Sequence, residues 1–594
     1  MRPIPAGPAR PTGQKRPDDP RGPRPADPGD RLLIAVARRG TWRAAGVFAA
    51  SALGAGAAVA LPAALGRALD LLLARDPAAG RWLALCAVLV AAEILLEAAE
   101  ALCAGTAQAG ATAWLRTRGV SRLLAAPPRT AAARFSPGDA ATRLAANATE
   151  AGAAPGTAAA LAAALFAPAG ALVALALVDV WCAVAFVAGL PLLLLVLRAF
   201  AAGSSDSVAR YQQVQSALAA RLAEALAGAR SIAAAGTLAR DRARILAPLP
   251  ELSAHGFRMW QVHGRAVARS GVLLPLLTTA VVAVGGFGVV AGRTSVGELL
   301  AASRYAALAA GLGTLAGLLG TLVRSRTAAR RTAELLSLPE LPYGARRLPP
   351  AARTPAPGTL ELRGVALTHD GARVLDGVDL VLPGGTTTAV VGRSGAGKSS
   401  LAAVAGRLCD PDEGSVLLDG VPLPELSEGE LRQQVGYAFE RPALLGDSLG
   451  AALASGARTA SPRQVREAAV SADADGFVAR LPQGYDTPPD EAPLSGGELQ
   501  RLGLARAFAH AGRLLVLDDA TSSLDTATER RVQEALARDL GPRTRLVVAH
   551  RLSSAARADV VVWLEEGRVR GVGTHHRLWE QRAYREVFAA GGGT

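Results

Sequence analysis

The chain has 594 residues, of which 50% are hydrophobic, 4% aromatic and 19% charged. This length exceeds what one hydrophobic core supports and the apolar content is too high for an unfolded chain, so a small binding module and a disordered protein are both excluded. The net charge of +14, from 64 Lys+Arg against 50 Asp+Glu, indicates an anionic partner, either nucleic acid or a membrane surface.

Residues 1–30 are rich in Pro, Arg, Gly and Asp, which predicts a disordered tail rather than a secretory signal. Arg38 and Arg39 then precede an apolar stretch. A twin-arginine signal is one interpretation of this pair, but the cationic flank of a first membrane helix accounts for it better.

The segment 31–336 is dominated by apolar runs long enough to cross a hydrocarbon layer of about 30 Å at roughly 20 residues each. The predicted crossings are 42–66, 82–105, 153–178, 180–201, 268–292 and 297–324. Between them, short connections alternate with two long polar ones, 106–152 and 202–267, which must share one side of the membrane. We therefore predict an all-α transmembrane domain of six helices over residues 31–336.

The two long connections carry many of the arginines of the chain, namely Arg116, Arg118, Arg122, Arg129, Arg134, Arg143, Arg221, Arg230, Arg240, Arg242 and Arg244. The positive-inside rule places these connections and the tail in the cytoplasm. Membrane topology thus accounts for the positive charge, and nucleic acid is excluded as a partner because no basic-aromatic module accompanies it. We expect an integral, multi-pass protein of the plasma membrane, surrounded by lipid.

Three carboxylates within the second predicted crossing, Glu93, Glu97 and Glu100, are spaced to share one helix face. Charged groups at such depth are costly unless they meet water, a partner or a cation. Either they line a cavity for a cationic or amphiphilic substrate, or they form a polar face that lines the inner mouth of the domain or pairs with nearby arginines. The second interpretation is the simpler one.

After a Pro- and Arg-rich linker at 337–357, the pattern changes to short β-rich runs that alternate with amphipathic stretches. The runs TLELRGVAL, TTTAVVG, RLLVLDD, TRLVVAH and ADVVVWLE predict a soluble α/β domain over 358–590 with a largely parallel sheet.

A phosphate-binding loop is predicted where TTTAVVG continues into RSGAGKSS, a G-x-x-x-x-G-K-S pattern between a strand and a helix. Its backbone N–H groups would curl around phosphates at a helix N-terminus. Lys398 supports this assignment, because the chain contains only one other lysine, Lys15, and a compact ammonium fits inside a phosphate cradle where a guanidinium does not. The candidate residues are Gly392, Ser394, Gly395, Gly397, Lys398, Ser399 and Ser400.

About 120 residues later, the buried run 514–517 ends in Asp518 and Asp519. A carboxylate at a strand end beside a phosphate loop is the expected partner of Mg²⁺, and we assign that role to Asp518, together with the hydroxyl of Ser399.

With these motifs the chain resembles the ABC transporters, and its helical half is similar to the six-helix domain of their exporter-type members. The family's signature sequence is matched by Ser495, Gly496, Gly497 and Glu498, its D-loop by Asp525 and its switch histidine by His550. Segments 136–144 and 221–236 are similar to the loops that carry coupling helices.

The resemblance implies a multidomain membrane protein in which the six-helix domain precedes an α/β P-loop nucleotide-binding domain with a helical subdomain. It also implies ATP and Mg²⁺ as cofactors and a dimer of cassettes, in which the signature of one chain contacts the ATP of the other. One membrane domain and one cassette make half a transporter, so a second half-transporter is the expected partner.

Three positions depart from the family pattern. Asp519 stands where the catalytic base is usually Glu, and a base retracted by about 1 Å can cost on the order of 100-fold in rate. Glu440 stands where a Gln usually senses Mg²⁺ and the attacking water. His369 stands where an aromatic ring usually stacks on adenine; it either stacks or is an ordinary loop histidine.

These departures favour a heterodimer over a homodimer, with slow hydrolysis in this chain's own site and a partner that supplies a Glu base, although Asp can also act as a base. The leading hypothesis is ATP-driven export of a small or amphiphilic substrate. The alternatives are an ATP-binding regulatory subunit with little hydrolysis of its own, and an importer of a chelated metal built on the exporter fold.

Overall fold

The computed structural model describes residues 27–311, 313–351, 356–369, 371–456, 458–539 and 543–589. The chain divides into two compact units. The helical unit comprises the chain up to Val120 together with Pro137–Ser337, and the α/β unit comprises Ser121–Ser136 together with the chain from Leu338 onwards.

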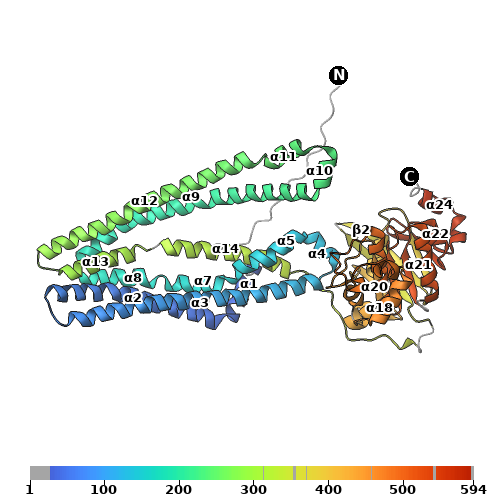
Figure 1. Cartoon of the computed structure of the whole chain (residues 1–594), viewed down its shortest axis with the longest axis horizontal. Coiled ribbons are helices and arrows are strands. Elements are labelled where there is room, and N and C mark those ends of the chain that lie inside the picture. Colours follow the sequence, from blue (N-terminus) through green and yellow to red (C-terminus); the bar gives the residue numbers. More distant parts are fainter. Residues whose placement is uncertain are drawn as a thin grey trace, which may run out of the picture. The chain divides into compact units, whose positions relative to one another are not determined.

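The helical unit contains α1 (Pro28–Arg39), α2 (Thr41–Leu73), most of α3 (Ala79–Ala125), α5 (Pro137–Thr142), α6 (Ala148–Gly152), α7 (Ala154–Ala163), α8 (Phe166–Val178), α9 (Val180–Ala227), α10 (Ala229–Ala235), α11 (Leu238–Leu246), α12 (Leu249–Val290), α13 (Val296–Ala309) and α14 (Gly313–Leu336). Two long helices, α9 and α12, lie side by side as a helical pair (Figure 1). Small residues dominate the core of this unit, so its helices approach closely.

Helices occupy all six predicted crossings, with two interruptions. The third, 153–178, is divided between α7 and α8, and the sixth, 297–324, between α13 and α14. Within the described residues, Thr41–Leu73, Ala79–Ala125 and Pro137–Val178 are long and apolar enough to span a membrane, and Val180–Pro191 and Pro275–Val290 are shorter apolar helices. The number of crossings stays a prediction.

The predicted disordered tail, residues 1–30, is wrong at its last residues. The carboxylate of Asp27 accepts a hydrogen bond from the N–H of Gly29 at 3.0 Å and so caps α1. Asp27 and Asp30 also form ion pairs with Arg330 and Arg326 of α14. Composition cannot reveal such contacts because the arginines lie about 300 residues away in sequence; residues 1–26 lie outside the described part.

The α/β unit contains helices α4 (Pro128–Arg134), α15 (Lys398–Ala405), α16 (Glu428–Gln434), α17 (Leu449–Ala454), α18 (Pro462–Ser471), α19 (Asp475–Val478), α20 (Gly496–His510), α21 (Thr526–Asp539), α22 (Leu552–Ala556), α23 (His575–Trp579) and α24 (Arg582–Ala589). Its strands are β1 (Leu360–His369), β2 (Ala372–Leu382), β3 (Thr387–Val391), β4 (Glu413–Leu418), β5 (Val421–Pro422), β6 (Val435–Phe439), β7 (Leu514–Asp518), β8 (Thr544–Val548), β9 (Val560–Glu565) and β10 (Arg568–Gly573).

The strands form two sheets. One has the order β10-β9-β3-β8-β7-β6 and is parallel from β9 to β6; the other has the order β2-β1-β4-β5 and is antiparallel. The expectation of one largely parallel sheet is therefore wrong for TLELRGVAL, which is β1. A short turn joins β1 to β2, and so short a connection can link only antiparallel strands.

A separate apolar cluster supports the helical subdomain. It contains Leu449 of α17, Val465 of α18, Phe477 of α19 and Phe508 of α20, all buried. This subdomain carries the N-terminus of α20, where the predicted signature begins.

The predicted linker at 337–357 packs on the α/β unit. The guanidinium of Arg407, only 1% exposed, donates to the carbonyl of Pro342 and stacks on the ring of Tyr343 at 4.5 Å. Arg346 also forms a β-bridge with Leu426. The described part of this segment is thus anchored.

The backbones of α2 and α13 approach each other closely at Gly66 and Gly297. A Cβ atom at Gly297 would lie 2.0 Å from the carbonyl oxygen of Gly66, and Asp70 of α2 accepts hydrogen bonds from the N–H of Gly297 at 2.8 Å and the hydroxyl of Ser295 at 2.6 Å. Because the backbones touch, Gly297→Ala is expected to destabilise the helical unit by about 1–3 kcal/mol. The thermal midpoint of the detergent-solubilised protein measures this.

Gly286→Ala in α12 is the matched control, since a Cβ there meets nothing within 4 Å. Equal midpoints for the two variants would contradict the packing argument.

Candidate functional site

The predicted catalytic and phosphate-binding residues converge at one edge of the six-stranded sheet. Strands β3, β8, β7 and β6 are adjacent and parallel, so their carboxyl ends lie together. β3 leads into the phosphate loop, β8 into His550, β7 into Asp518 and Asp519, and β6 into Glu440.

The phosphate loop depends on glycine at two positions. Gly395 and Gly397 have φ angles of 81° and 97°, which side-chain-bearing residues rarely adopt. A Cβ at Gly397 would also lie 2.6 Å from the carbonyl oxygen of Val374 in β2. Ser394 is exposed on the same loop, and Gly392 begins it. The loop therefore adopts a backbone conformation that requires glycine, as expected for a loop that closes around an anion.

Lys398 is the first residue of α15 and is only 6% exposed. Its ammonium donates to the carbonyl oxygens of Gly392 at 2.9 Å and Arg393 at 3.0 Å. Burial lowers the pKa of Lys398, an effect that the nearby Asp519 and Asp518 oppose. The loop thus folds around a positive charge that lies beside the N-terminal turn of a helix, an arrangement suited to phosphate.

Asp518 lies at the end of β7, opposite Phe439 of β6. Burial raises the pKa of Asp518, whereas hydrogen bonds from Ser399 and Tyr437 lower it. Its Oδ2 atom accepts from the hydroxyl of Tyr437 at 3.1 Å, while its buried Oδ1 atom has no hydrogen-bond partner among the described residues. An unpartnered carboxylate oxygen beside a hydroxyl fits a magnesium ion, which takes its remaining ligands from phosphate and water.

Asp519 and His550 meet directly. The imidazole Nε2 lies 3.1 Å from the carboxylate oxygens of Asp519. The backbone of Asp519 has a φ angle of 52°, a conformation in which Asp is enriched among non-glycine residues. Substitution of Glu by Asp at this position is therefore compatible with the local backbone.

Glu440 is exposed and directly follows β6. Phe439 of β6 pairs with Asp518 of β7, and Glu440 and Asp519 are the residues that follow this pair on the two strands. The sequence assigned no role to Gln500 of α20, although the structure places it at the centre of this region. Its amide nitrogen donates to the carbonyl of Glu440 at 2.9 Å and the hydroxyl of Ser522 at 2.9 Å. Its amide oxygen accepts from the N–H of Ser523 at 2.9 Å.

Gln500, 3% exposed, therefore holds the signature helix, the segment after β6 and the D-loop in one arrangement. Its position after the signature was the only sequence signal for it. The contact partners lie 22 to 60 residues away, so sequence spacing cannot identify them.

The predicted signature forms the start of α20. Ser495 and Glu498 make a reciprocal capping box, in which the N–H of each is hydrogen-bonded to the side chain of the other, at 2.9 and 3.3 Å. The hydrogen bonds that the Glu498 carboxylate accepts from the N–H and the hydroxyl of Ser495 lower the pKa of Glu498. A Cβ at Gly497 would lie 3.2 Å from the carbonyl oxygen of Ser523, whereas Gly496 has open space around it. A preformed, glycine-lined helix N-terminus is available to bind an anion.

Asp525 and His369, two further predicted site residues, lie at the ends of other elements than the four strands described above. Asp525 caps α21 by accepting from the N–H groups of Ala527 and Thr528, both at 3.0 Å. His369 is the exposed last residue of β1, paired with Ala372 across the turn to β2.

In the helical unit, Glu93, Glu97 and Glu100 lie on α3 and form no ion pair within the described residues.

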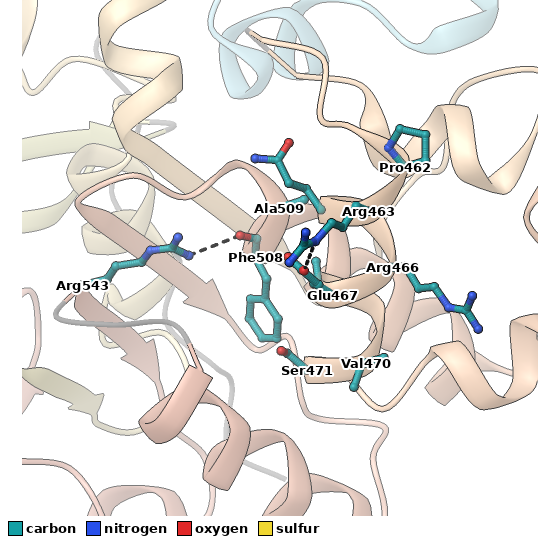
Figure 2. Close-up of a pocket in the computed structure, with 11 residues that line it drawn as sticks. Pro462, Arg463, Arg466, Glu467, Val470, Ser471, Phe508, Ala509 and Arg543 are labelled. Carbon is teal, nitrogen blue, oxygen red and sulfur yellow. Dashed lines mark hydrogen bonds and ion pairs between the residues drawn. The ribbon is translucent and has the colours of Figure 1, made fainter.

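One cavity of the α/β unit lies apart from this site. It encloses about 970 Å³ and is lined by α18, α20 and Arg543 (Figure 2). Its charged groups are engaged: Arg463 pairs with Glu467 at 2.7 Å and Arg543 donates to the carbonyl of Phe508 at 3.3 Å. None of the predicted site residues lines it.

Comparison with known families gives two matches. The model described as "ABC transporter transmembrane region" matches residues 45–311, and the model described as "ABC transporter" matches residues 375–522. An "ABC transporter ATP-binding protein RamA" of Streptomyces coelicolor is 59% identical over 545 residues, 92% of this chain and 85% of that relative. The chain belongs to the ABC transporter family.

Other relatives agree with this membership. An "ATP-dependent lipid A-core flippase" of Hahella chejuensis is 44% identical over 229 residues, 38% of this chain and 39% of that protein. A solved bacterial Atm1-family ABC exporter with ATP bound superposes with a TM-score of 0.74 and 25% identity, over 94% of this chain and all of that one. The ABC protein described here is thus an exporter-type half-transporter that binds ATP, and it needs a second chain to complete the transporter.

The geometry of the phosphate loop makes a specific prediction for Lys398. Lys398→Arg retains the charge but puts a planar guanidinium in a site enclosed by the Gly392 and Arg393 carbonyls. Loss of one charge-assisted hydrogen bond to phosphate should weaken ATP binding roughly tenfold or more. Equilibrium binding of labelled ATP to the purified transporter measures this.

Arg393→Lys, the reverse exchange at an exposed position of the same loop, is expected to leave the affinity unchanged. An unaltered affinity in Lys398→Arg would show that the ammonium does not contact the nucleotide.

Proposed function

We propose that this chain is the slowly hydrolysing half of a heterodimeric ABC exporter. The observation that carries the proposal is the contact between Asp519 and His550, with Asp519 at the position of the family's catalytic Glu and in a left-handed backbone conformation. The side chain is one methylene shorter than Glu and its orientation is tied to the histidine. A water molecule attacking the terminal phosphate would therefore be poorly reached from this carboxylate.

The signature residues, in contrast, are complete. Ser495, Gly497 and the N-terminus of α20 are preformed by the capping box with Glu498. Because the signature acts on the ATP of the opposite chain, a chain with a weak base and an intact signature suits a partner whose own site hydrolyses. A homodimer, in which Asp519 serves both sites, is the alternative.

Within the nucleotide site, Ser399 and Asp518 would hold Mg²⁺, and Glu440 would adjoin it. When bound, the ion neutralises charge that develops on the phosphates. Lys398 and the loop N–H groups orient the phosphates, and His550 holds Asp519. His369, exposed at the end of β1, is the residue we propose to stack on the adenine.

The substrate proposed is a small or amphiphilic molecule moved outward across the plasma membrane, with the tail and the cassette on the cytoplasmic side. A cavity of about 630 Å³ in the helical unit supports an amphiphile, since Leu65, Val90 and Ile94 line it together with Arg304. On α3, Glu93 directly precedes Ile94 and Glu97 lies three residues after it. Import of a chelated metal is the alternative direction, and vesicles of known orientation distinguish the two.

Substitutions of Asp519 test the slow site. Asp519→Asn keeps the shape and the left-handed backbone but removes the base, so it should change hydrolysis by the heterodimer less than twofold. Asp519→Glu restores the missing methylene and should accelerate hydrolysis at this site roughly ten- to hundredfold. Phosphate release by the reconstituted transporter is the measurement.

Replacement of the partner's catalytic Glu by Gln is the reference and should abolish hydrolysis. If Asp519→Asn reduces hydrolysis as much as the replacement in the partner does, Asp519 acts as a catalytic base and the slow-site proposal fails. If Asp519→Asn also leaves transport unchanged while ATP binding remains necessary, the chain is a regulatory subunit.

The composition of the transporter is a separate prediction. Native mass spectrometry of the tagged chain, extracted gently from its own membranes, should show one copy of this chain with one copy of a different half-transporter. A dimer of this chain alone would contradict the heterodimer.

A further inference from the structure

One segment outside the cassette sequence belongs to the α/β unit. Residues Ser121–Ser136, which contain the end of α3 and all of α4, pack with the unit that binds ATP. The N–H of Leu341 donates to the carbonyl of Ala125 at 3.4 Å, and Arg122 forms an ion pair with Glu340. The segment 136–144, which is similar to a loop that carries a coupling helix, contains α5 and from Pro137 onwards is grouped with the helical unit.

From this segment, Arg129 reaches the phosphate loop. Its guanidinium donates to the hydroxyl of Ser400 at 2.8 Å. Ser400 is 7% exposed and lies in the first turn of α15, directly after the predicted magnesium ligand Ser399. Burial raises the pKa of both Tyr437 and Asp518, and the positive charge of Arg129 opposes this rise in each case, so Arg129 acts on the same end of β7.

The surroundings of Ser400 contain positive charge as well as the nearby carboxylates of Asp518 and Asp519. The N-terminal turn of a helix carries partial positive charge, and Lys398 adds a full charge two residues from Ser400. The neutral hydroxyl of Ser400 is a weak acceptor for a group with five N–H donors. A phosphate oxygen forms shorter and stronger hydrogen bonds to guanidinium than a hydroxyl does.

We propose that Arg129 is a nucleotide-binding residue, which the loop after α3 supplies to the phosphates of ATP. Arg129 donates to Ser400 when no phosphate is present and to a phosphate oxygen when ATP is bound. α3 runs without interruption from Ala79 to Ala125, three residues before α4, so the segment that carries Arg129 is continuous in sequence with a long apolar helix. The inference depends on ATP binding by this chain and not on its rate of hydrolysis.

The test is photolabelling of the intact transporter by 8-azido-ATP on ice, with this chain resolved from its partner, in competition with ATP, ADP and adenosine. Arg129→Ala should weaken the binding of ATP and of ADP roughly tenfold or more, as expected for loss of a charge-assisted hydrogen bond. The affinity for adenosine, which has no phosphate, should be unchanged. Arg129→Lys should recover most of the affinity and Arg129→Gln should not.

Arg122→Ala is the matched control. It removes an ion pair that anchors the same segment through Glu340, and the proposal expects wild-type affinity for ATP. The proposal is overturned if the affinity of Arg129→Ala for ATP is within twofold of the wild-type affinity. It is also overturned if Arg122→Ala loses as much affinity for ATP as Arg129→Ala does. Should Arg129→Ala fail to assemble, the contrast between Lys and Gln at this position decides: equal affinities would overturn the proposal. Since binding is measured without turnover, this result is independent of the role of Asp519.

Discussion

The alignment of four parallel strand ends is the constraint on which the rest of the cassette depends. β3, β8, β7 and β6 are neighbours in that order, so their carboxyl ends open on one edge. The strands themselves are buried and apolar, and the residues that follow them are polar. A phosphate loop, a histidine, two carboxylates and Glu440 therefore meet although they are separated by up to about 160 residues of sequence.

Opposite charges lie close together at this edge of the sheet. The buried ammonium of Lys398 is held by two carbonyl oxygens and faces Asp518 and Asp519. The arrangement contains cationic and helix N-terminal groups that a polyphosphate would complement, and a carboxylate oxygen of Asp518 without a hydrogen bond, which a magnesium ion would complement. Arg129 adds a second cation to this balance from a distant part of the chain.

The site is also connected mechanically. Gln500 joins the signature helix to the D-loop and to the backbone of Glu440, so a shift in any one of these segments strains the hydrogen bonds of the other two. Through Ser121–Ser136, the same unit continues covalently into α3.

The sequence by itself predicted which residues carry the chemistry. The phosphate loop and the Asp pair follow from short local patterns whose chemistry depends on adjacent residues, whereas the signature and His550 follow from the resemblance to the family. The apolar runs likewise predicted helices, since a span needs about 20 successive apolar residues. Only the tertiary structure decided what contacts these residues make over long separations: the contact of Asp519 with His550, the three hydrogen bonds of Gln500, the antiparallel setting of β1, and the packing of Ser121–Ser136 with the cassette. Such contacts depend on strand order and on how distant segments pack, and no local pattern of residue types encodes them.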